Sequence, residues 1–127
     1  MNWSETKGFK DTDIGVLLGK TLTAATGAKD EDVMRLTTQD GDSYVFYHSQ
    51  DCCESVRIED IVGDLADLIG EPLTEAEEVK REATSEEASE SGTWTFYKLG
   101  TRKGSVTVRW LGESNGYYSE SVDFAKA

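Results

Sequence analysis

Long apolar runs are missing from this sequence, and none approaches the roughly 18 residues that a membrane-spanning helix needs. The first residues, Met1 to Glu5, lack the basic and then apolar pattern of a secretory signal. We therefore expect a cytoplasmic protein without a membrane partner. The 127 residues suit a single domain over 1–127, and 37% hydrophobic residues are enough to build its core.

Basic residues are also scarce. The chain has 13 lysines and arginines against 25 aspartates and glutamates, which gives a formal net charge of −12. Such an excess repels nucleic acid and anionic membranes, so we expect no direct binding of nucleic acid. Many of the carboxylates fall between residues 71 and 90, and such a block is typical either of a solvated segment or of an acidic interaction surface. The sequence is compatible with either interpretation of this acidic block.

Cysteine and histidine are nearly absent, and the few that occur are close together. The cysteines are the neighbours Cys52 and Cys53, and His48 is the one histidine. Because ordinary bridges join well-separated Cα atoms, the pattern predicts no disulfide, in agreement with a reducing compartment. A metal site or a cysteine nucleophile with His48 as its base is conceivable, but structural zinc sites space their cysteines by two to four residues. We expect a tight corner with a small buried thiol, and no metal.

No nucleotide-binding glycine motif or P-loop is present, and carboxylate pairs carry little information in so acidic a chain. The sequence therefore predicts neither a cofactor nor an enzyme.

Residue periodicity predicts mostly antiparallel β structure. Alternating apolar residues and turn signals such as Asp40-Gly41 and Asn115-Gly116 favour hairpins. Helical spacing predicts one short helix over 60–70, between polar residues and Gly70. Residues 1–13 are expected to form an N-terminal arm and residues 80–91 an acidic flexible loop. The expected strands cover 20–25, 33–38, 43–48, 54–61, 93–99, 105–111 and 117–124, with 73–79 able to pair at a sheet edge. The predicted class is α+β, with two packed sheets of about six or seven strands.

Two of the scarce arginines, Arg57 and Arg109, lie inside strand patterns. Val106, Val108 and Trp110 should face the core, which places Arg109 on the opposite face. A strand arginine on that face can bind phosphate or lie flat on a purine. A cross-strand ion pair with a carboxylate is the equally available alternative.

Several segments of the chain resemble a family of small phage and prophage proteins. The shared segments are His48–Val56, Ile58–Ile61, Gly63–Leu65, Asp67–Gly70, Trp94–Lys98, Arg109–Trp110 and Gly112–Ser119. The family carries an aromatic residue where this chain has Arg57, and it matches residues 75–91 only loosely. Size, β-rich fold and phage context are similar to those of the Thoeris anti-defence signal sponges. That resemblance implies a homo-oligomer that sequesters cyclic ADP-ribose-type messengers or cyclic oligonucleotides in an infected bacterium.

The predicted function is therefore sequestration of a cyclic nucleotide messenger without cleavage. The candidate ligand-binding residues are Arg57, Arg109, Phe96, Tyr97, Asn115 and Tyr117. They offer arginines for phosphates and aromatic rings for a base. The alternative is an acidic inhibitor that imitates DNA and binds a basic surface of a host defence protein.

Overall fold

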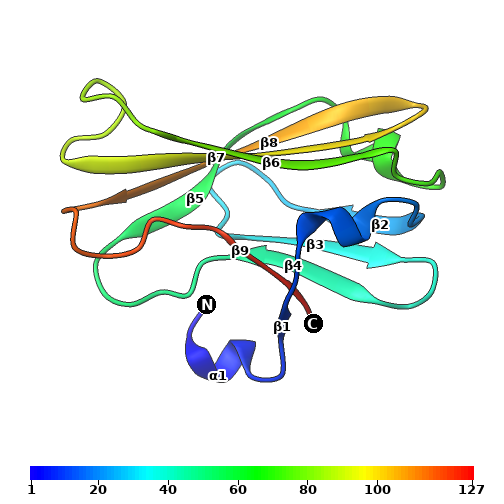
Figure 1. The fold of residues 1–127 in the computed structure, drawn as a ribbon, viewed down its shortest axis with the longest axis horizontal. Helices are drawn as coiled ribbons and strands as arrows, with labels where there is room; N and C mark the ends of the chain where they lie inside the picture. Colours follow the sequence, from blue (N-terminus) through cyan, green and yellow to red (C-terminus); the bar gives the residue numbers. More distant parts are fainter.

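A computed structural model describes the backbone of residues 1–127 and every side chain except that of Trp3. The described residues form nine strands in two sheets that pack face to face (Figure 1). The strands are β1 (Lys10–Asp11), β2 (Leu22–Thr26), β3 (Val33–Thr38), β4 (Ser43–Tyr47), β5 (Ser55–Val62), β6 (Glu75–Glu82), β7 (Ser91–Thr101), β8 (Gly104–Ser114) and β9 (Asp123–Lys126). The predicted pair of antiparallel sheets is confirmed, although the strands are more numerous than predicted.

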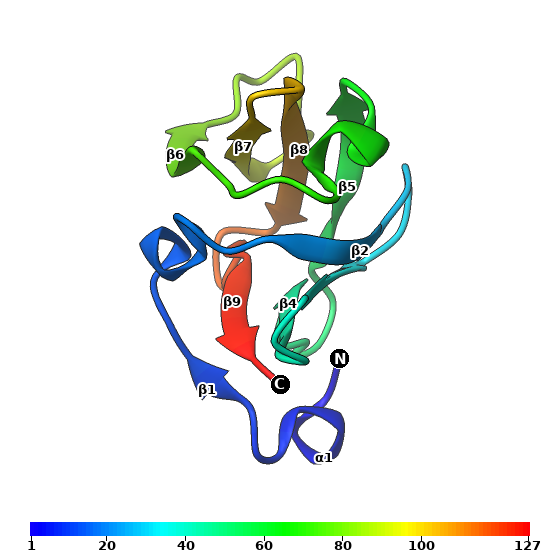
Figure 2. The same ribbon diagram turned by 90° about the vertical axis from the view of Figure 1, so that its right-hand side faces the viewer.

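One sheet has five strands in the order β1-β9-β4-β3-β2, and the other has four in the order β5-β8-β7-β6. Figure 2 shows the two sheets as separate layers, with the chain crossing between them after β4 and after β8. The Asp40-Gly41 turn joins β3 to β4 as predicted, with Thr37 opposite Ser43. The turn at Asn115-Gly116 does not make the predicted hairpin, because β9 pairs with β4 and β1 instead of β8.

The core lies between the sheets. Alternation places Phe46 of β4 and Phe124 of β9 on the inner face of the five-stranded sheet, where their ring centroids are 4.7 Å apart. Ile58 and Trp110, which are opposite each other in β5 and β8, supply the facing side. Burial of these rings and aliphatic chains is the main favourable term for the fold.

The helical segments differ from the one short helix that was predicted. The described part of the chain has one α-helical turn, α1 (Trp3–Thr6), and two 3₁₀ turns, η1 (Ile14–Leu17) and η2 (Leu65–Leu68). None of the described helices is long and apolar enough to cross a membrane.

The predicted helix over 60–70 is wrong for a local reason. The β-branched residues Ile61 and Val62 continue β5 and pair with β8. Gly63, at φ 109°, then turns the chain away from the strand. Only the η2 turn follows, and the Asp64 carboxylate accepts from the Ala66 N–H at its start.

Two other boundaries move. β6 continues through Glu82, which is opposite Thr93 of β7, so the acidic loop begins at Ala83 and not at residue 80. Flexibility of this loop stays a prediction. The strand expected over 117–124 lies further along the chain, because β9 covers Asp123–Lys126 and overlaps the predicted range only at 123–124.

The N-terminal segment does not project as an arm. β1 adds to the edge of the five-stranded sheet, where Lys10 is opposite Lys126. Phe9 packs edge-on against Tyr47, with ring centroids 5.6 Å apart. Val45, Tyr47 and Ala125 form a second small apolar cluster beneath this segment, on the outer face of the sheet. We call this surface the covered face.

Candidate functional site

The outer face of the four-stranded sheet carries the arginines that the sequence analysis selected. Strand register places Arg57 of β5 opposite Leu111 of β8, and Arg109 of β8 opposite Phe96 of β7. Arg81 of β6 is opposite Trp94. We call this surface the open face; its residues are Arg57, Asp60, Val79, Arg81, Trp94, Phe96, Arg109 and Leu111. Three of the five arginines in the chain therefore lie on one face.

The centre of the open face is an aromatic pair flanked by two arginines. The rings of Trp94 and Phe96 are parallel within 5°, with centroids 5.7 Å apart. The Arg109 guanidinium carbon lies 4.9 Å from the Trp94 ring centroid, and that of Arg81 lies 5.6 Å from it. Both guanidinium carbons are 5.9 Å from the Phe96 ring centroid. These distances are within the range of cation–π attraction.

Arg109 and Arg57, the two arginines selected from the sequence, each have a carboxylate neighbour. Arg109 Nη1 is 3.4 Å from Asp60 Oδ2, and the two side chains are 35% and 50% exposed. Arg57 lies 3.3 Å from Glu59 and 3.5 Å from Glu113. The ion-pair alternative for both arginines is thus present in the structure. Such exposed pairs stabilise a fold by only about 0–1 kcal/mol.

The loop between β6 and β7 closes one end of the open face. Glu87 accepts from Arg81 Nη1 at 2.9 Å and from Nη2 at 3.0 Å, as a bidentate pair. Hydrogen bonds from Arg81 and from the Thr84 N–H lower the pKa of the Glu87 carboxyl to about 2. The loop therefore holds the Arg81 guanidinium beside Trp94.

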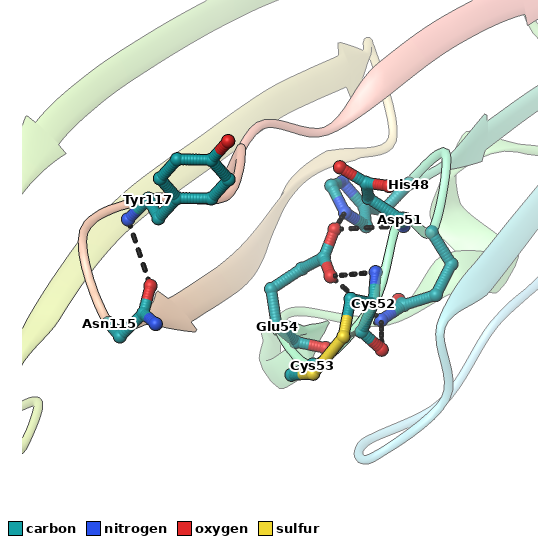
Figure 3. The surroundings of a disulfide bond; sticks show 8 residues. His48, Asp51, Cys52, Cys53, Glu54, Asn115 and Tyr117 are labelled. Carbon is teal, nitrogen blue, oxygen red and sulfur yellow. Dashed lines mark hydrogen bonds and ion pairs between the residues drawn. A yellow bond between two sulfur atoms is a disulfide. The ribbon is translucent and has the colours of Figure 1, made fainter.

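A buried hydrogen-bonded pair, His48 and Glu54, organises the turn between β4 and β5. His48 Nε2 lies 2.7 Å from Glu54 Oε2, and Nδ1 lies 2.7 Å from the carbonyl of Ser121 (Figure 3). Glu54 also accepts from the N–H groups of Asp51 and Cys52, at 3.1 and 2.9 Å. Burial alone would raise the pKa of Glu54, but the bonds from His48 and from these backbone groups lower it to about 2. Because a carbonyl only accepts, Nδ1 of His48 donates to Ser121.

The cysteines differ from the expectation. Cys52 and Cys53 are joined by a disulfide, with Cα atoms 3.7 Å apart, and both residues are exposed (Figure 3). The predicted absence of a disulfide and the predicted buried thiol are both wrong. The usual geometry describes bridges between distant residues, whereas here the turn held by Glu54 brings adjacent sulfurs together. The cysteines consequently give no argument for a reducing compartment.

The arrangement of His48 and the cysteines fits neither alternative, a metal site or a cysteine nucleophile with His48 as its base. Both of its ring nitrogens are hydrogen-bonded, and both sulfurs are in the disulfide. Among the described residues, no group of three or more histidine, cysteine or acidic side chains is arranged to hold a metal ion.

A hollow of about 330 Å³ adjoins the open face beside the disulfide. Its lining residues are Cys53, Ser55, Ser89, Glu90, Glu113, Ser114, Asn115 and Tyr118. Arg57 connects it to the open face, because Arg57 Nη1 donates to Ser55 Oγ at 3.1 Å. The hollow is rich in hydroxyl and carboxylate groups, which suit polar parts of a ligand.

The wall of the hollow formed by Asn115 is held by the segment that crosses to β9. Asn115 Oδ1 accepts from the Tyr117 N–H at 2.9 Å, and the Glu120 carboxylate accepts from Thr93 at 2.8 Å. A Cβ at Gly112 would lie 2.3 Å from the Glu120 carbonyl oxygen. Only glycine allows this close crossing.

The six predicted ligand residues are therefore not gathered in one place. Arg109 and Phe96 meet at the centre of the open face, Arg57 lies between it and the hollow, and Asn115 lines the hollow. Tyr117 is 83% exposed on the same turn. Tyr97 does not join them, because it is fully buried in the core with its ring 4.6 Å from Phe46. Burial and the nearby Glu78 carboxylate raise the pKa of the Tyr97 hydroxyl.

Sequence reasoning missed Arg81, Trp94 and Glu54. Trp94 shares the alternation of Phe96, so the sequence already contained the signal for an aromatic pair on one face. Arg81 joins that pair only through the register of β6 against β7, which no local pattern reveals. Glu54 shares its alternation with the core residues Val56 and Ile58, and this placement was the signal for an inward carboxylate.

Comparison with known proteins places the chain in one family. It belongs to the family described as a domain of unknown function (DUF7448), which matches residues 16–124. No curated protein and no solved structure matches it. The matched range includes the open face, the disulfide turn and the hollow, whereas α1 and β1 precede it. The resemblance to phage proteins and to signal sponges stays a prediction.

Proposed function

We propose that this protein sequesters a small cyclic nucleotide messenger on the open face and releases it unchanged. The observation that supports the proposal best is the parallel pair of Trp94 and Phe96, with the guanidinium groups of Arg81 and Arg109 over their rings. A purine can stack against an aromatic ring or a guanidinium plane, and a phosphate accepts charge-assisted hydrogen bonds from arginine.

The carboxylate partners of the arginines do not prevent such binding. Arg109 contacts Asp60 by one long bond of 3.4 Å at a partly exposed position. A bound phosphate offers shorter bonds with full negative charge, which are stronger than an exposed ion pair. The net charge of −12 still disfavours long polyanions, so a compact ligand fits the open face better than nucleic acid.

The resemblance to phage proteins supplies the biological setting of the proposal. In an infected bacterium, a counter-defence protein would have to remove a messenger of the cyclic ADP-ribose type or a cyclic oligonucleotide at low concentration. That requires a dissociation constant on the order of nanomolar, about −12 kcal/mol. Sequestration needs binding contacts alone and no catalytic group.

The test is binding followed by recovery. The purified protein is incubated with a panel of cyclic ADP-ribose isomers and cyclic di- and trinucleotides, separated from free ligand and heated. Chromatography should then recover one ligand intact. Uptake of none of the ligands would contradict the proposal, and recovery of a changed product would identify an enzyme.

Variants locate the site. Arg109→Ala should weaken binding about 10- to 100-fold, because it removes a charge-assisted contact. The matched control is Arg102→Ala, which loses the same charge in a turn where Arg102 pairs with Glu71. Equal effects of the two substitutions would show that general charge, and not the open face, governs affinity.

A charge mimic that binds a basic host protein is the second candidate. Its support is the run of exposed carboxylates along β6 and the following loop, within a chain of net charge −12. Because residues 75–82 form a strand of the sheet, deleting them would disturb the fold, so the test replaces carboxylates with neutral amides. A triple variant with Glu75→Gln, Glu82→Gln and Glu86→Gln should abolish competition with duplex DNA for a basic DNA-binding protein, and it should leave messenger binding unchanged. Salt should weaken the mimic steeply.

A further inference from the structure

Strand β6 is a long, exposed edge of the four-stranded sheet. Within the described part of the chain, its outer side pairs with no other strand. Seven of its eight residues are exposed. The Ala83 N–H donates to the Gly92 carbonyl at 2.8 Å, and in an antiparallel ladder such bonding residues alternate. Val79 therefore turns its backbone groups toward β7, whereas Glu78 and Lys80 turn theirs toward the free edge.

The order of charges along β6 is self-complementary. The strand reads Glu75-Ala76-Glu77-Glu78-Val79-Lys80-Arg81-Glu82. If two copies pair antiparallel about Val79, Glu78 of each lies opposite Lys80 of the other. Glu77 of each then lies opposite Arg81 of the other, so the interface has four attractive pairs. Side chains opposite each other in a ladder share a face, so these pairs can meet.

Neighbouring registers have fewer attractive pairs. Hydrogen-bond alternation allows shifts that keep Glu78 and Lys80 on the pairing side. Centring the pairing on Glu78 places that carboxylate opposite its own copy and leaves two attractive pairs, between Glu75 of each copy and Arg81 of the other, instead of four. Centring it on Lys80 places two lysines together and Glu78 opposite Glu82. Charge thus selects the register about Val79.

We propose that two copies of this chain pair through β6 in the register centred on Val79. The dimer would have one continuous eight-stranded sheet, with the two open faces side by side across the twofold axis. Charged edge strands usually prevent association; here the charges allow one partner, a second copy in one register. Glu87 and the Glu82 carbonyl use three of the five donors of Arg81, which leaves donors for the partner's Glu77. This inference does not depend on any ligand.

Charge exchange tests the interface. Sedimentation should give twice the mass of the chain for the natural protein at high concentration. Glu78→Lys and Lys80→Glu should each raise the dimer dissociation constant at least about tenfold, because two attractive pairs become repulsive. The double variant Glu78→Lys/Lys80→Glu should restore the dimer. The control Glu31→Lys makes the same charge change at an exposed residue away from β6 and should dimerise normally.

Circular dichroism verifies that each variant is folded. A natural protein that stays monomeric at its highest soluble concentration would overturn the proposal, as would a dimer unaffected by either single substitution. A double variant that stays monomeric would also contradict the register centred on Val79.

Amide hydrogen exchange provides a second measurement that needs no substitution. Protection of the Glu78 and Lys80 amides should rise with protein concentration, whereas the Val79 amide should be protected at every concentration. Concentration-independent exchange at Glu78 and Lys80 would contradict pairing through this edge.

Discussion

The two outer faces of the sandwich differ in what lies over them. On the covered face, Val45 and Tyr47 are buried beneath the N-terminal segment, and Phe9 packs directly on Tyr47. On the open face, the aromatic pair of Trp94 and Phe96 has arginine side chains and one loop over it. The first surface is covered by the N-terminal segment, and the second by arginine side chains and the β6–β7 loop.

This difference separates stability from recognition. Removing a side chain that is packed beneath backbone leaves a cavity that the surrounding chain cannot fill, so the unfolding free energy falls strongly. Removing a ring that lies beneath a guanidinium group should lower the unfolding free energy less, because the arginine already lies partly in water. A residue type on the covered face should therefore matter mainly for folding, and the same type on the open face mainly for binding.

The largest effect should come from the buried carboxylate at the disulfide turn. Glu54→Gln removes the buried carboxylate that binds His48 and the N–H groups of Asp51 and Cys52, and it should cost about 4 kcal/mol of unfolding free energy in urea. Glu87→Gln, in the open-face loop, should cost much less, because its bonds to Arg81 are exposed to water and salt. Equal losses would remove the contrast between buried and open pairs.

The same carboxylate should appear in the pH dependence. The pKa of Glu54 is lowered from 4.5 to about 2 in the folded protein. Its stabilisation is thus complete above about pH 4.5 and is lost as the pH falls toward about 2. Unfolding free energies measured across this window should fall less steeply in Glu54→Gln than in the natural protein.

Aromatic truncation compares the two faces directly. Tyr47→Ala should cost about 3 kcal/mol, since its side chain is 4% exposed and packed beneath Phe9. Phe96→Ala should cost about 1 kcal/mol, since this ring is only partly buried, yet it should weaken messenger binding. Urea titration and ligand uptake of both variants measure the two effects. The reverse pattern, with ligand binding lost only in Tyr47→Ala, would place recognition elsewhere.

The smallest effect should come from Arg109→Lys. Lysine keeps the charge beside Asp60 but loses the flat guanidinium over Trp94, so the unfolding free energy should fall by about 0.5 kcal/mol. Messenger affinity should fall more clearly, because lysine makes no bidentate bonds to phosphate. Arg102→Lys is the control for both measurements. Unchanged binding in Arg109→Lys would reduce the role of this arginine to charge alone.

Local patterns predicted much of the sheet structure. β3 has the predicted bounds, and β4, β5, β7 and β8 differ from prediction only at their ends. Alternation also placed Arg57 and Arg109 away from the core correctly. The helix over 60–70 failed because its apolar spacing also fits a strand followed by a turn, and pairing with β8 decided between them.

The candidate site was less predictable. Phe96 and Tyr97 are adjacent, so alternation alone excludes both from sharing one face, and the core took Tyr97. The disulfide was missed because rules for distant cysteines do not describe neighbours in a turn.

The sequence by itself determined the β-rich class, the acidic charge and the faces of most strands, because side-chain alternation and composition are local properties. Only the tertiary structure decided that Arg81 meets Trp94, that Glu54 is paired with His48, and that one outer face is covered. Those contacts depend on strand register and on which segment crosses which sheet, and such long-range pairings follow from the packing of the whole chain.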